Sequence, residues 1–483
     1  MVEQIAINFA ANVFSAALGL FNVIVFTRLF APAEFGTYVL GAGFAVILST
    51  FLCSWLRLPI MREQARGDGT DVRGVIVPGL LASALLAPLA YPAARAVGLA
   101  SGPAWAAVAL ALAIGLFETS QELLRSKLAA FTVMKATVAR ALLVPALGAA
   151  FALGGPTGLL LLASSMLAYL LAALAFIRPI WSGTRITFDA ARLLRYAKAG
   201  MPLTFSLTLL ALSSVIDRFI IAHLVGATGA GQYSPGVDLV RQALIIPAVS
   251  ASAAFVPMAV KILANHGRAA ATVHLAECFE FLMAITLPAC IGFALVSSHI
   301  ANVMLGPEFR GVGANVMPIV CIAVVFQIIC CQYLHISFLL SERNSFYLLN
   351  TGSVLAFNAA VSYVLIEHYG MVGAAWGRLA AEMFGFLGAL ALTRWAFPVP
   401  LPLGRLARIL LAAAAMAVAV KGMEAILPMS DANALMLLVP TGMASYGGLC
   451  WIMDIAEMRS RLAGSFKTVR GRLSPAMRPS NAK

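Results

Sequence analysis

Charged side chains are scarce in this sequence. Only 11% of the 483 residues are charged, whereas 61% are hydrophobic and the mean hydropathy is +0.92. A soluble domain carries about 25% charged and 45–50% apolar residues, so ordinary soluble, disordered and fibrous proteins are excluded. The apolar runs have helix length, about 20 residues, and not the roughly 10-residue alternation of an outer-membrane barrel. The composition therefore predicts an all-α polytopic membrane protein.

Motifs for metal binding or covalent chemistry are missing as well. The seven cysteines show no CxxC spacing and no accompanying His/Cys cluster, so we expect buried free thiols and no bound metal. There is no Gly-rich phosphate loop, no nucleophile elbow and no carboxylate pair with acid–base spacing. The sequence thus favours a protein that is not an enzyme and has no resident cofactor. The N-terminus lacks a basic n-region and a cleavage site, so the first helix is expected to remain as an anchor.

Fourteen segments are long enough to cross a hydrocarbon core of about 30 Å. Gly and Pro mark two of the shortest connections, at Gly154-Gly155-Pro156 and at Tyr369-Gly370. The expected spans are residues 4–27, 37–60, 74–97, 103–125, 131–153, 156–177, 200–224, 234–258, 276–300, 314–340, 346–367, 370–394, 407–427 and 434–454.

The basic residues predict the orientation of these spans. The net charge of +13 does not indicate nucleic-acid binding, because most lysines and arginines gather in the loops on one side and in the C-terminal tail. The opposite side holds only Arg28, Arg95 and Arg310. By the positive-inside rule both termini face the cytoplasm, in agreement with an even number of spans. The tail is expected to lie near anionic lipid headgroups.

Local identities at a fixed offset indicate an internal repeat. The segment TRLFAPAEFGTY (27–38) matches AHLVGATGAGQY (222–233), and Gly36 and Tyr38 coincide with Gly231 and Tyr233. A second echo, at the start of the sixth and twelfth spans, has a similar offset. An even number of helices per unit predicts two parallel six-helix repeats, an arrangement that some transporters use.

The repeat predicts a division of the chain into two lobes and two additions. A basic amphipathic stretch, FDAARLLRYAKAG, lies between the sixth and seventh spans and reads as a short interfacial helix. We therefore expect a six-helix lobe over 1–180, a linker over 181–199, a second six-helix lobe over 200–400, two additional helices over 401–455 and a basic tail over 456–483.

Four local patterns together resemble a known family. They are TRLFAPAEFGTY after the first span, LRLPIMREQARG (56–67), the Asp217-Arg218 pair followed by Gly231-Gln232-Tyr233, and Tyr369-Gly370 with Gly373-Ala374-Ala375. In this order they are similar to Wzx-type polysaccharide flippases of the multidrug/oligosaccharidyl-lipid/polysaccharide exporter superfamily, over about residues 1–455. The resemblance implies a V-shaped, two-lobed bundle with a central cavity. It implies movement of a polyprenyl-pyrophosphate-linked oligosaccharide from the cytoplasmic to the periplasmic leaflet.

Ionisable residues inside membrane spans are expensive and are therefore candidate functional residues. An arginine suits a pyrophosphate, because its planar fork binds two phosphate oxygens at once. An alternative for each arginine is snorkelling to the interface or a packing role. The candidate substrate-binding residues are Arg57, Arg140, Arg218, Arg241 and Arg378.

Three carboxylates, Asp217, Asp238 and Glu382, are candidates for coupling or structural ion pairs. The spacings Asp238/Arg241 and Arg378/Glu382 allow pairing on one helix face, as does Lys421/Glu424 near the end of the thirteenth span. Asp217 and Arg218 point about 100° apart. One arrangement directs Arg218 to substrate and Asp217 to Arg241 or another cation. Alternatively, an acid in the cavity binds the coupling ion, H⁺ or Na⁺.

Two other functions stay open on sequence alone. A drug or metabolite antiporter of the same superfamily would share the fold, but it typically has twelve helices and an acidic cavity. A membrane polymerase or glycosyltransferase would need a substantial periplasmic loop, and none is predicted. The expected location is the bacterial inner membrane. The expected partners are the lipid-linked oligosaccharide, membrane lipids and polysaccharide assembly proteins, and the product class (lipopolysaccharide, capsule or exopolysaccharide) is left open.

Overall fold

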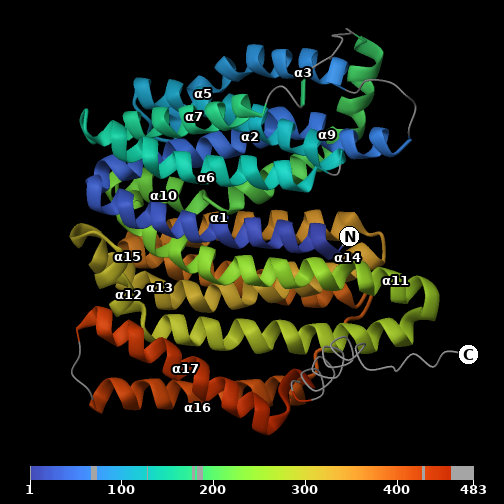
Figure 1. The fold of residues 1–483 in the computed structure, drawn as a ribbon, viewed down its shortest axis with the longest axis vertical. Helices are drawn as coiled ribbons and strands as arrows, with labels where there is room; N and C mark the ends of the chain where they lie inside the picture. Colours follow the sequence, from blue (N-terminus) through green and yellow to red (C-terminus); the bar gives the residue numbers. More distant parts are fainter. Residues whose placement is uncertain are drawn as a thin grey trace, which may run out of the picture.

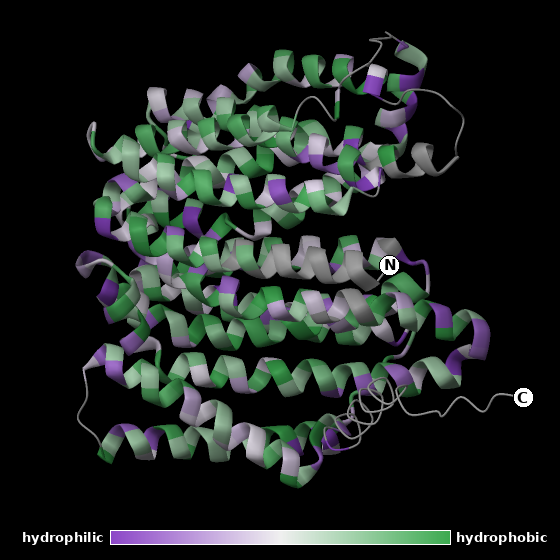
Figure 2. Cartoon of the chain, in the orientation of Figure 1, coloured by the Kyte–Doolittle hydropathy of each residue, from purple (hydrophilic) through white to green (hydrophobic). Residues whose placement is uncertain are grey.

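A computed structural model describes residues 2–66, 73–127, 129–176, 180–181, 189–426, 430–457 and 459, and these are almost entirely helical. Long helices run side by side along one common direction (Figure 1). Apolar residues cover their outer faces as well as their contacts (Figure 2), and Leu85 and Leu153 are 81% and 92% exposed. A helix that is apolar all round belongs in a core or a membrane. The chain is therefore a multi-pass membrane protein.

The N-terminal half contains the first six spans. Pro88 and Pro92 lie where the third span is interrupted by a short 3₁₀ turn, Ala87–Ala90. The helices are α1 (Val2–Leu29), α2 (Pro32–Arg66), α3 (Arg73–Leu86) continued by α4 (Tyr91–Ala96), α5 (Ser101–Ser126), α6 (Ala130–Ala152) and α7 (Gly158–Ala175).

The C-terminal half contains the other spans and two very long helices. A π-helical turn, Ile329–Leu334, separates α13 from α14. The helices are α9 (Ala190–Ser213), α10 (Ile216–Leu224), α11 (Ala227–Leu295), α12 (Ser297–Met304), α13 (Pro307–Ile328), α14 (His335–Leu340), α15 (Asn344–Thr393), α16 (Leu403–Ile426) and α17 (Asp431–Met453).

The described helices account for the predicted fourteen spans. Ten of them are long and apolar enough to cross a membrane. Two of the ten, α11 and α15, are broken at Gly267 and Gly370, where φ is 76° and 59°, so each supplies two spans. The bent pair α9–α10 adds one span, and α1, with 28 residues, adds another. The predicted break at Tyr369-Gly370 is confirmed.

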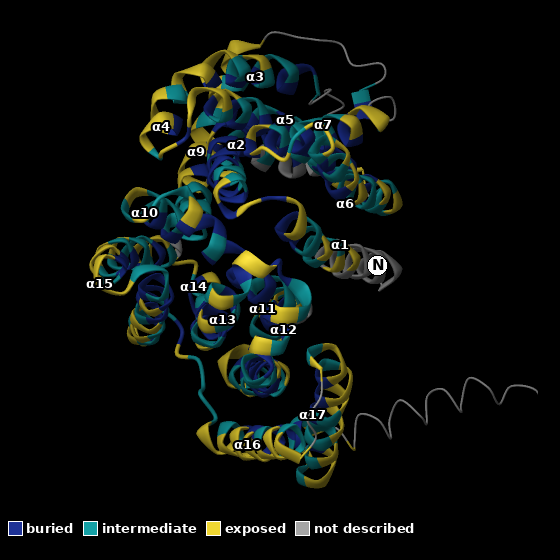
Figure 3. Cartoon of the chain, turned by 90° about the vertical axis from the view of Figure 1, so that its left-hand side faces the viewer, coloured by how far each residue is buried: buried dark blue, intermediate teal, exposed yellow. Residues whose placement is uncertain are grey.

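The halves and the two added helices are distinct in space. The helices α2 to α7 form one bundle, in which α9 also lies beside α2, and α11 to α15 form the other, with α1 and α10 between them (Figures 1 and 3). The helices α16 and α17 pack on the C-terminal half, on the side away from the N-terminal half (Figure 3). This arrangement confirms two six-helix lobes plus two additional helices. The residue boundaries proposed for the lobes stay a prediction.

The region around the linker differs from the expectation. The amphipathic stretch is not a separate helix, because α9 runs without interruption from Ala190 through the membrane segment to Ser213. Residues 182–188 lie outside the described part of the chain, as does the basic tail beyond residue 459. The seventh span was expected to be one helix over 200–224, but it breaks after Ser213 and bends by 49°.

Polar contacts fasten the added hairpin α16–α17 at both of its ends. The Glu280 carboxylate on α11 binds Arg405 Nη1 at 2.7 Å and accepts a hydrogen bond from the backbone N–H of Ala456 at 3.0 Å. At the opposite end His299 Nδ1 on α12 lies 2.7 Å from Asp431 Oδ1. The hairpin is therefore an integral part of the C-terminal half.

Candidate functional site

The break in the seventh span organises the charged residues of the C-terminal half. Helix α9 ends at Ser213 and α10 begins at Ile216, with Val215 between them in a non-helical conformation. The Nη1 of Arg241 donates a hydrogen bond to the carbonyl oxygen of Ser214 at 2.9 Å. The guanidinium thus satisfies and stabilises a carbonyl group at the negative end of the α9 dipole. Broken membrane helices need such partners, and transporters place substrate and ion sites at them.

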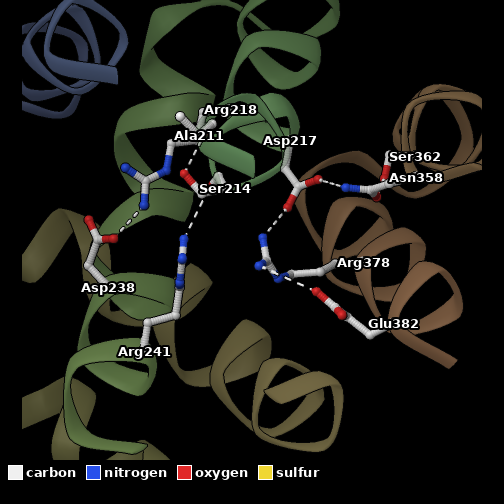
Figure 4. Close-up of polar contacts among 10 residues, drawn as sticks. All are labelled: Ala211, Ser214, Asp217, Arg218, Asp238, Arg241, Asn358, Ser362, Arg378 and Glu382. Carbon is white, nitrogen blue, oxygen red and sulfur yellow. Dashed lines mark hydrogen bonds and ion pairs between the residues drawn. The ribbon is translucent and has the colours of Figure 1, made fainter. Parts of the chain in front are cut away.

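A buried ion pair joins α10 to α15. Arg378 Nη1 donates to Asp217 Oδ2 at 2.9 Å, and both side chains are 3% exposed or less (Figure 4). Asn358 Nδ2 donates to the other oxygen, Asp217 Oδ1, at 2.7 Å, and Ser362 holds the Asn358 amide at 2.8 Å. Both oxygens of Asp217 are thus engaged. The cation that Asp217 meets is Arg378 and not Arg241.

The predicted pair on α15 forms with a looser geometry. Arg378 Nη2 lies 3.7 Å from Glu382 Oε1, which confirms the i,i+4 prediction. The Nε of Arg378 is buried without a hydrogen-bond partner among the described residues. The guanidinium therefore binds Asp217 firmly and retains one N–H donor, at Nε, for a further acceptor.

Asp238 pairs with a different arginine from the one that its spacing suggested. Its carboxylate binds Arg218 Nη2, across the gap between α10 and α11, and not Arg241 on its own helix (Figure 4). Arg218 is 11% and Asp238 27% exposed. The adjacent residues Asp217 and Arg218 thus do point to different partners, as their 100° separation requires, but Arg218 meets a carboxylate.

These contacts involve five of the eight predicted ionisable residues, in the two groups Asp217–Arg378–Glu382 and Arg218–Asp238, and Arg241 binds the Ser214 carbonyl just before the start of α10. The set contains three arginines and three carboxylates, so its net charge is zero when all six are charged, although Arg241 contacts a backbone carbonyl and not a carboxylate. The residues are Asp217, Arg218, Asp238, Arg241, Arg378 and Glu382.

Arg140 lies in the N-terminal half, on α6, with aromatic partners. Its Nη1 donates to the Tyr169 hydroxyl at 3.2 Å, and its guanidinium lies 5.1 Å and 5.8 Å from the ring centres of Tyr169 and Phe117. In the described part of the chain no carboxylate pairs with it.

Arg57 is not the uncompensated cation that the sequence suggested. Its Nη2 donates to Ser54 Oγ at 2.7 Å, and its Nη1 lies 3.6 Å from Glu118 Oε2 on α5. The prediction considered only acids on the same helix and therefore missed Glu118, which lies inside the apolar run 103–125. Lys421 and Glu424 pair at 2.7 Å as predicted, and Glu424 also contacts His299 at 3.3 Å.

The sequence argument missed the neutral members of the site. Asn358 and Ser362 orient Asp217, while Tyr169 orients Arg140. Each is a polar residue inside an apolar span, a weaker signal than a charge. Their partners lie up to 141 residues away in the chain, so local spacing could not identify them.

The described chain is a polytopic helical membrane bundle with ion pairs beside the broken seventh span. A family model described as "Polysaccharide biosynthesis protein" matches residues 25–313. The chain belongs to this family. The resemblance that the local patterns indicated is confirmed at the level of family and fold. No curated protein matches the chain in sequence.

Solved structures show the same architecture. A structure described as "Lipid II flippase MurJ, inward closed conformation" aligns with a TM-score of 0.78 at 15% identity, covering 93% of this chain and 99% of that one. An inward-facing multidrug resistance MATE family transporter of the MOP superfamily has a TM-score of 0.59 at 16% identity, covering 81% and 95%. At these identities the similarity establishes the fold. With the family, it supports a transporter or flippase of the membrane.

Proposed function

We propose that this protein flips a polyprenyl-pyrophosphate-linked oligosaccharide from the cytoplasmic to the periplasmic leaflet of the bacterial inner membrane. The family description places the chain in polysaccharide biosynthesis, and the structure with the TM-score of 0.78 is described as a lipid II flippase. On this proposal both termini face the cytoplasm, and the cargo is delivered to polysaccharide assembly proteins on the other side.

The observation that carries the proposal is that Arg140 has no carboxylate partner among the described residues. A cation at membrane depth without a carboxylate partner is costly, and an anionic cargo supplies the missing charge. The Tyr169 hydroxyl and the two aromatic rings fix the orientation of its guanidinium. A guanidinium held in this way presents a rigid fork to two phosphate oxygens.

The second cationic contact comes from Arg218 by exchange. Its partner Asp238 is 27% exposed, whereas the carboxylate of Asp217 is 2% exposed. A phosphate entering between the lobes competes with Asp238 for Arg218 more readily than with Asp217 for Arg378. Breaking the Arg218–Asp238 contact removes one of the two described polar contacts that hold α11 at the bend in the seventh span, while the Arg241–Ser214 hydrogen bond remains. Cargo binding is thereby coupled to the conformation of the broken helix.

The geometry favours Glu382 as the coupling acid. Asp217 has both oxygens occupied by Asn358 and Arg378, so a proton or Na⁺ would have to displace strong contacts. Glu382 has only a 3.7 Å contact with Arg378. Protonating Glu382, or pairing it with Na⁺, leaves the Asp217–Arg378 pair intact and changes the charge around Arg378 by one unit.

A drug antiporter for cationic compounds is less well supported. Such a cavity needs carboxylates in excess, but each carboxylate of this network faces an arginine, and Arg140 adds a further positive charge. A polymerase or glycosyltransferase is disfavoured for a different reason, since the structurally similar proteins are transporters.

Reconstitution distinguishes these functions. Vesicles would contain purified protein and a fluorescent polyprenyl-diphosphate sugar in both leaflets. An impermeant reductant outside would bleach the fluorophore in the outer leaflet, so the loss of the remaining fluorescence would measure exchange of the lipid between the leaflets. The proposal expects faster exchange than in empty vesicles for the diphosphate lipid and none for a neutral polyprenyl glycoside. Uptake of a cationic dye without exchange of the diphosphate lipid would instead identify an antiporter.

A further inference from the structure

A cluster of sulfur and imidazole ligands lies at the junction of α13 and α14, outside the ionic network. The sequence argument expected buried free thiols without a His/Cys cluster; the cysteines are free and six of the seven are buried, but Cys330, Cys331 and His335 do cluster in space. Cys330 Sγ lies 3.4 Å from His335 Nε2, and the ligand atoms of Cys330, Cys331 and His335 all lie within 4.8 Å of one another. Two adjacent cysteines and a histidine five residues later show no familiar metal-binding spacing.

The π-helical turn explains why these residues meet. In a regular α-helix, residues five apart are separated by about 140° around the axis, so Cys330 and His335 would point in different directions. Residues 329–334 form a π turn, with its wider i→i+5 closure. This turn brings the two side chains together. Such π insertions cost helix regularity and occur frequently at functional sites.

The spacing suits a tetrahedral metal ion. With metal–sulfur bonds of about 2.3 Å and metal–nitrogen bonds of about 2.1 Å, tetrahedral angles place S and N about 3.6 Å apart. The observed separation of Cys330 Sγ and His335 Nε2 is 3.4 Å. Two thiolates and a neutral imidazole around a divalent cation have zero net charge. A neutral complex is the form that a low-dielectric membrane interior tolerates best.

A side chain from α15 completes the surroundings of the cluster. Asn350 Nδ2 donates to Cys330 Sγ at 3.4 Å and lies 3.1 Å from His335 Nε2, and Asn350 is buried. The Tyr347 ring packs edge-on against the His335 ring with 4.8 Å between centres. A hydrogen bond donated to a ligating thiolate is a typical outer contact of a metal site.

We propose that Cys330, Cys331 and His335 bind a thiophilic d¹⁰ cation, Zn²⁺, with one coordination position left for water. Both thiol protons leave to solvent when the metal binds, and no electrons are transferred. His335 lies five residues before the end of α14, about 8 Å from the end predicted to face the cytoplasm. Metal therefore enters from the reducing compartment, where thiols persist.

Binding there would stabilise the π turn itself, because all three ligands lie between residues 330 and 335, and Asn350 supplies the contact with α15. In the thiol form, Cys330 Sγ donates to the carbonyl oxygen of Gly385 at 3.7 Å, and Gly385 lies three residues after Glu382. Metal binding replaces this contact with coordination. The role that follows is structural: the ion holds the π turn together, and the Asn350 hydrogen bond to Cys330 Sγ links that turn to α15, the helix that carries Arg378 and Glu382.

Cobalt substitution tests the site directly. Full-length protein in detergent, reduced and stripped with a chelator, would be titrated with Co²⁺ and then with Zn²⁺. We expect one Co²⁺ per chain, with a thiolate-to-cobalt charge-transfer band and visible bands of tetrahedral Co²⁺, all displaced by Zn²⁺. The variants Cys330→Ser, Cys331→Ser and His335→Gln should lose the tetrahedral signature. Asn350→Ala should weaken affinity by about 10–100-fold.

Two cysteine variants serve as controls. Cys321→Ala removes another buried thiol of α13 and should leave the spectrum unchanged. Cys278→Ala tests the contact between Cys278 and His274, which lie 3.5 Å apart on α11. Absence of the charge-transfer band in wild type overturns the proposal, as does its loss in Cys278→Ala alone. If Cys330→Ser elutes as aggregate, Cys331→Ser and His335→Gln decide: an unchanged band in both contradicts the site.

Discussion

Gly36 and Gly231, which the repeat pairs at an offset of 195 residues, pack against each other backbone to backbone. A Cβ on Gly36 would lie 1.9 Å from the Ala227 carbonyl oxygen and 3.0 Å from Gly231 N. A Cβ on Gly231 would lie 1.9 Å from the Pro32 carbonyl oxygen and 2.9 Å from Gly36 N. The contact is reciprocal, as expected for two residues beside an axis that relates the lobes. The two repeat glycines thus allow the backbones of the two halves to pack closely near the starts of α2 and α11.

Alanine at either glycine should separate the lobes at this contact. Gly36→Ala and Gly231→Ala each force the backbones apart by more than about 1 Å, and overpacking of this kind costs about 1–3 kcal/mol. We expect a lower Tm for each variant in detergent. Gly311→Ala is the matched control, because a Cβ on that α13 glycine meets nothing within 4 Å. Equal Tm values for Gly36→Ala and Gly311→Ala would show that the lobes do not close here.

The buried pair Asp217–Arg378 should matter for stability. Removing one partner leaves an uncompensated charge, which costs about 3–5 kcal/mol. Arg378→Met should therefore lower the free energy of unfolding strongly, and the double variant Asp217→Asn/Arg378→Met should recover a large part of the loss. A double-mutant cycle by chemical denaturation measures this coupling. Additive losses would contradict a direct pair.

The acid that couples transport should be identifiable by substitution. Glu382→Gln removes the charge but keeps the size of the side chain, so transport should persist without its dependence on an imposed proton or Na⁺ gradient. Asp238→Asn is the comparison, because freeing Arg218 should instead raise the exchange rate at low cargo concentration. Retained gradient dependence in Glu382→Gln would exclude Glu382 as the coupling acid.

Accessibility of introduced cysteines should fix the topology. Of the native cysteines six are buried, and Cys331 is half-buried, so they react slowly with an impermeant maleimide. A cysteine at Arg268, beside the exposed break in α11, should be labelled only after membrane disruption, whereas one at Gly311 should be labelled in intact cells. Labelling of both positions in intact cells would refute the fourteen-span topology with cytoplasmic termini.

The fold could be predicted because its physical signals are local. Runs of apolar residues, the breakers at Gly154-Gly155-Pro156 and Gly370, and the basic loops each act over a few residues. The break after Ser213 could not be predicted, because no Gly or Pro marks it. Its stabilising contact comes from Arg241 on the next helix, through the Ser214 carbonyl. Tertiary contacts and not local propensity decide that conformation.

The candidate site was predicted as a set of residues but not as a set of pairs. The free-energy cost of burying charge in a membrane selected residues such as Asp217, Arg218 and Arg378, which form ion pairs in the structure; their role in transport stays a prediction. The pairing followed helix spacing only where both partners share α15 or α16. Arg57 and Asp238 found partners on neighbouring helices, as did Cys330 with Asn350 of α15, because packing in a bundle brings together residues that sequence distance separates.

Cargo exchange by Arg140 variants tests the central claim most directly. In vesicles containing the fluorescent polyprenyl-diphosphate sugar, Arg140→Gln should lower the exchange rate at least tenfold, while its expression and Tm stay at the wild-type values. Arg140→Lys should recover only part, since lysine supplies charge without the fork. Lys421→Gln, which alters a 54% exposed lysine paired with Glu424, should exchange at the wild-type rate. Wild-type exchange by Arg140→Gln would contradict the account.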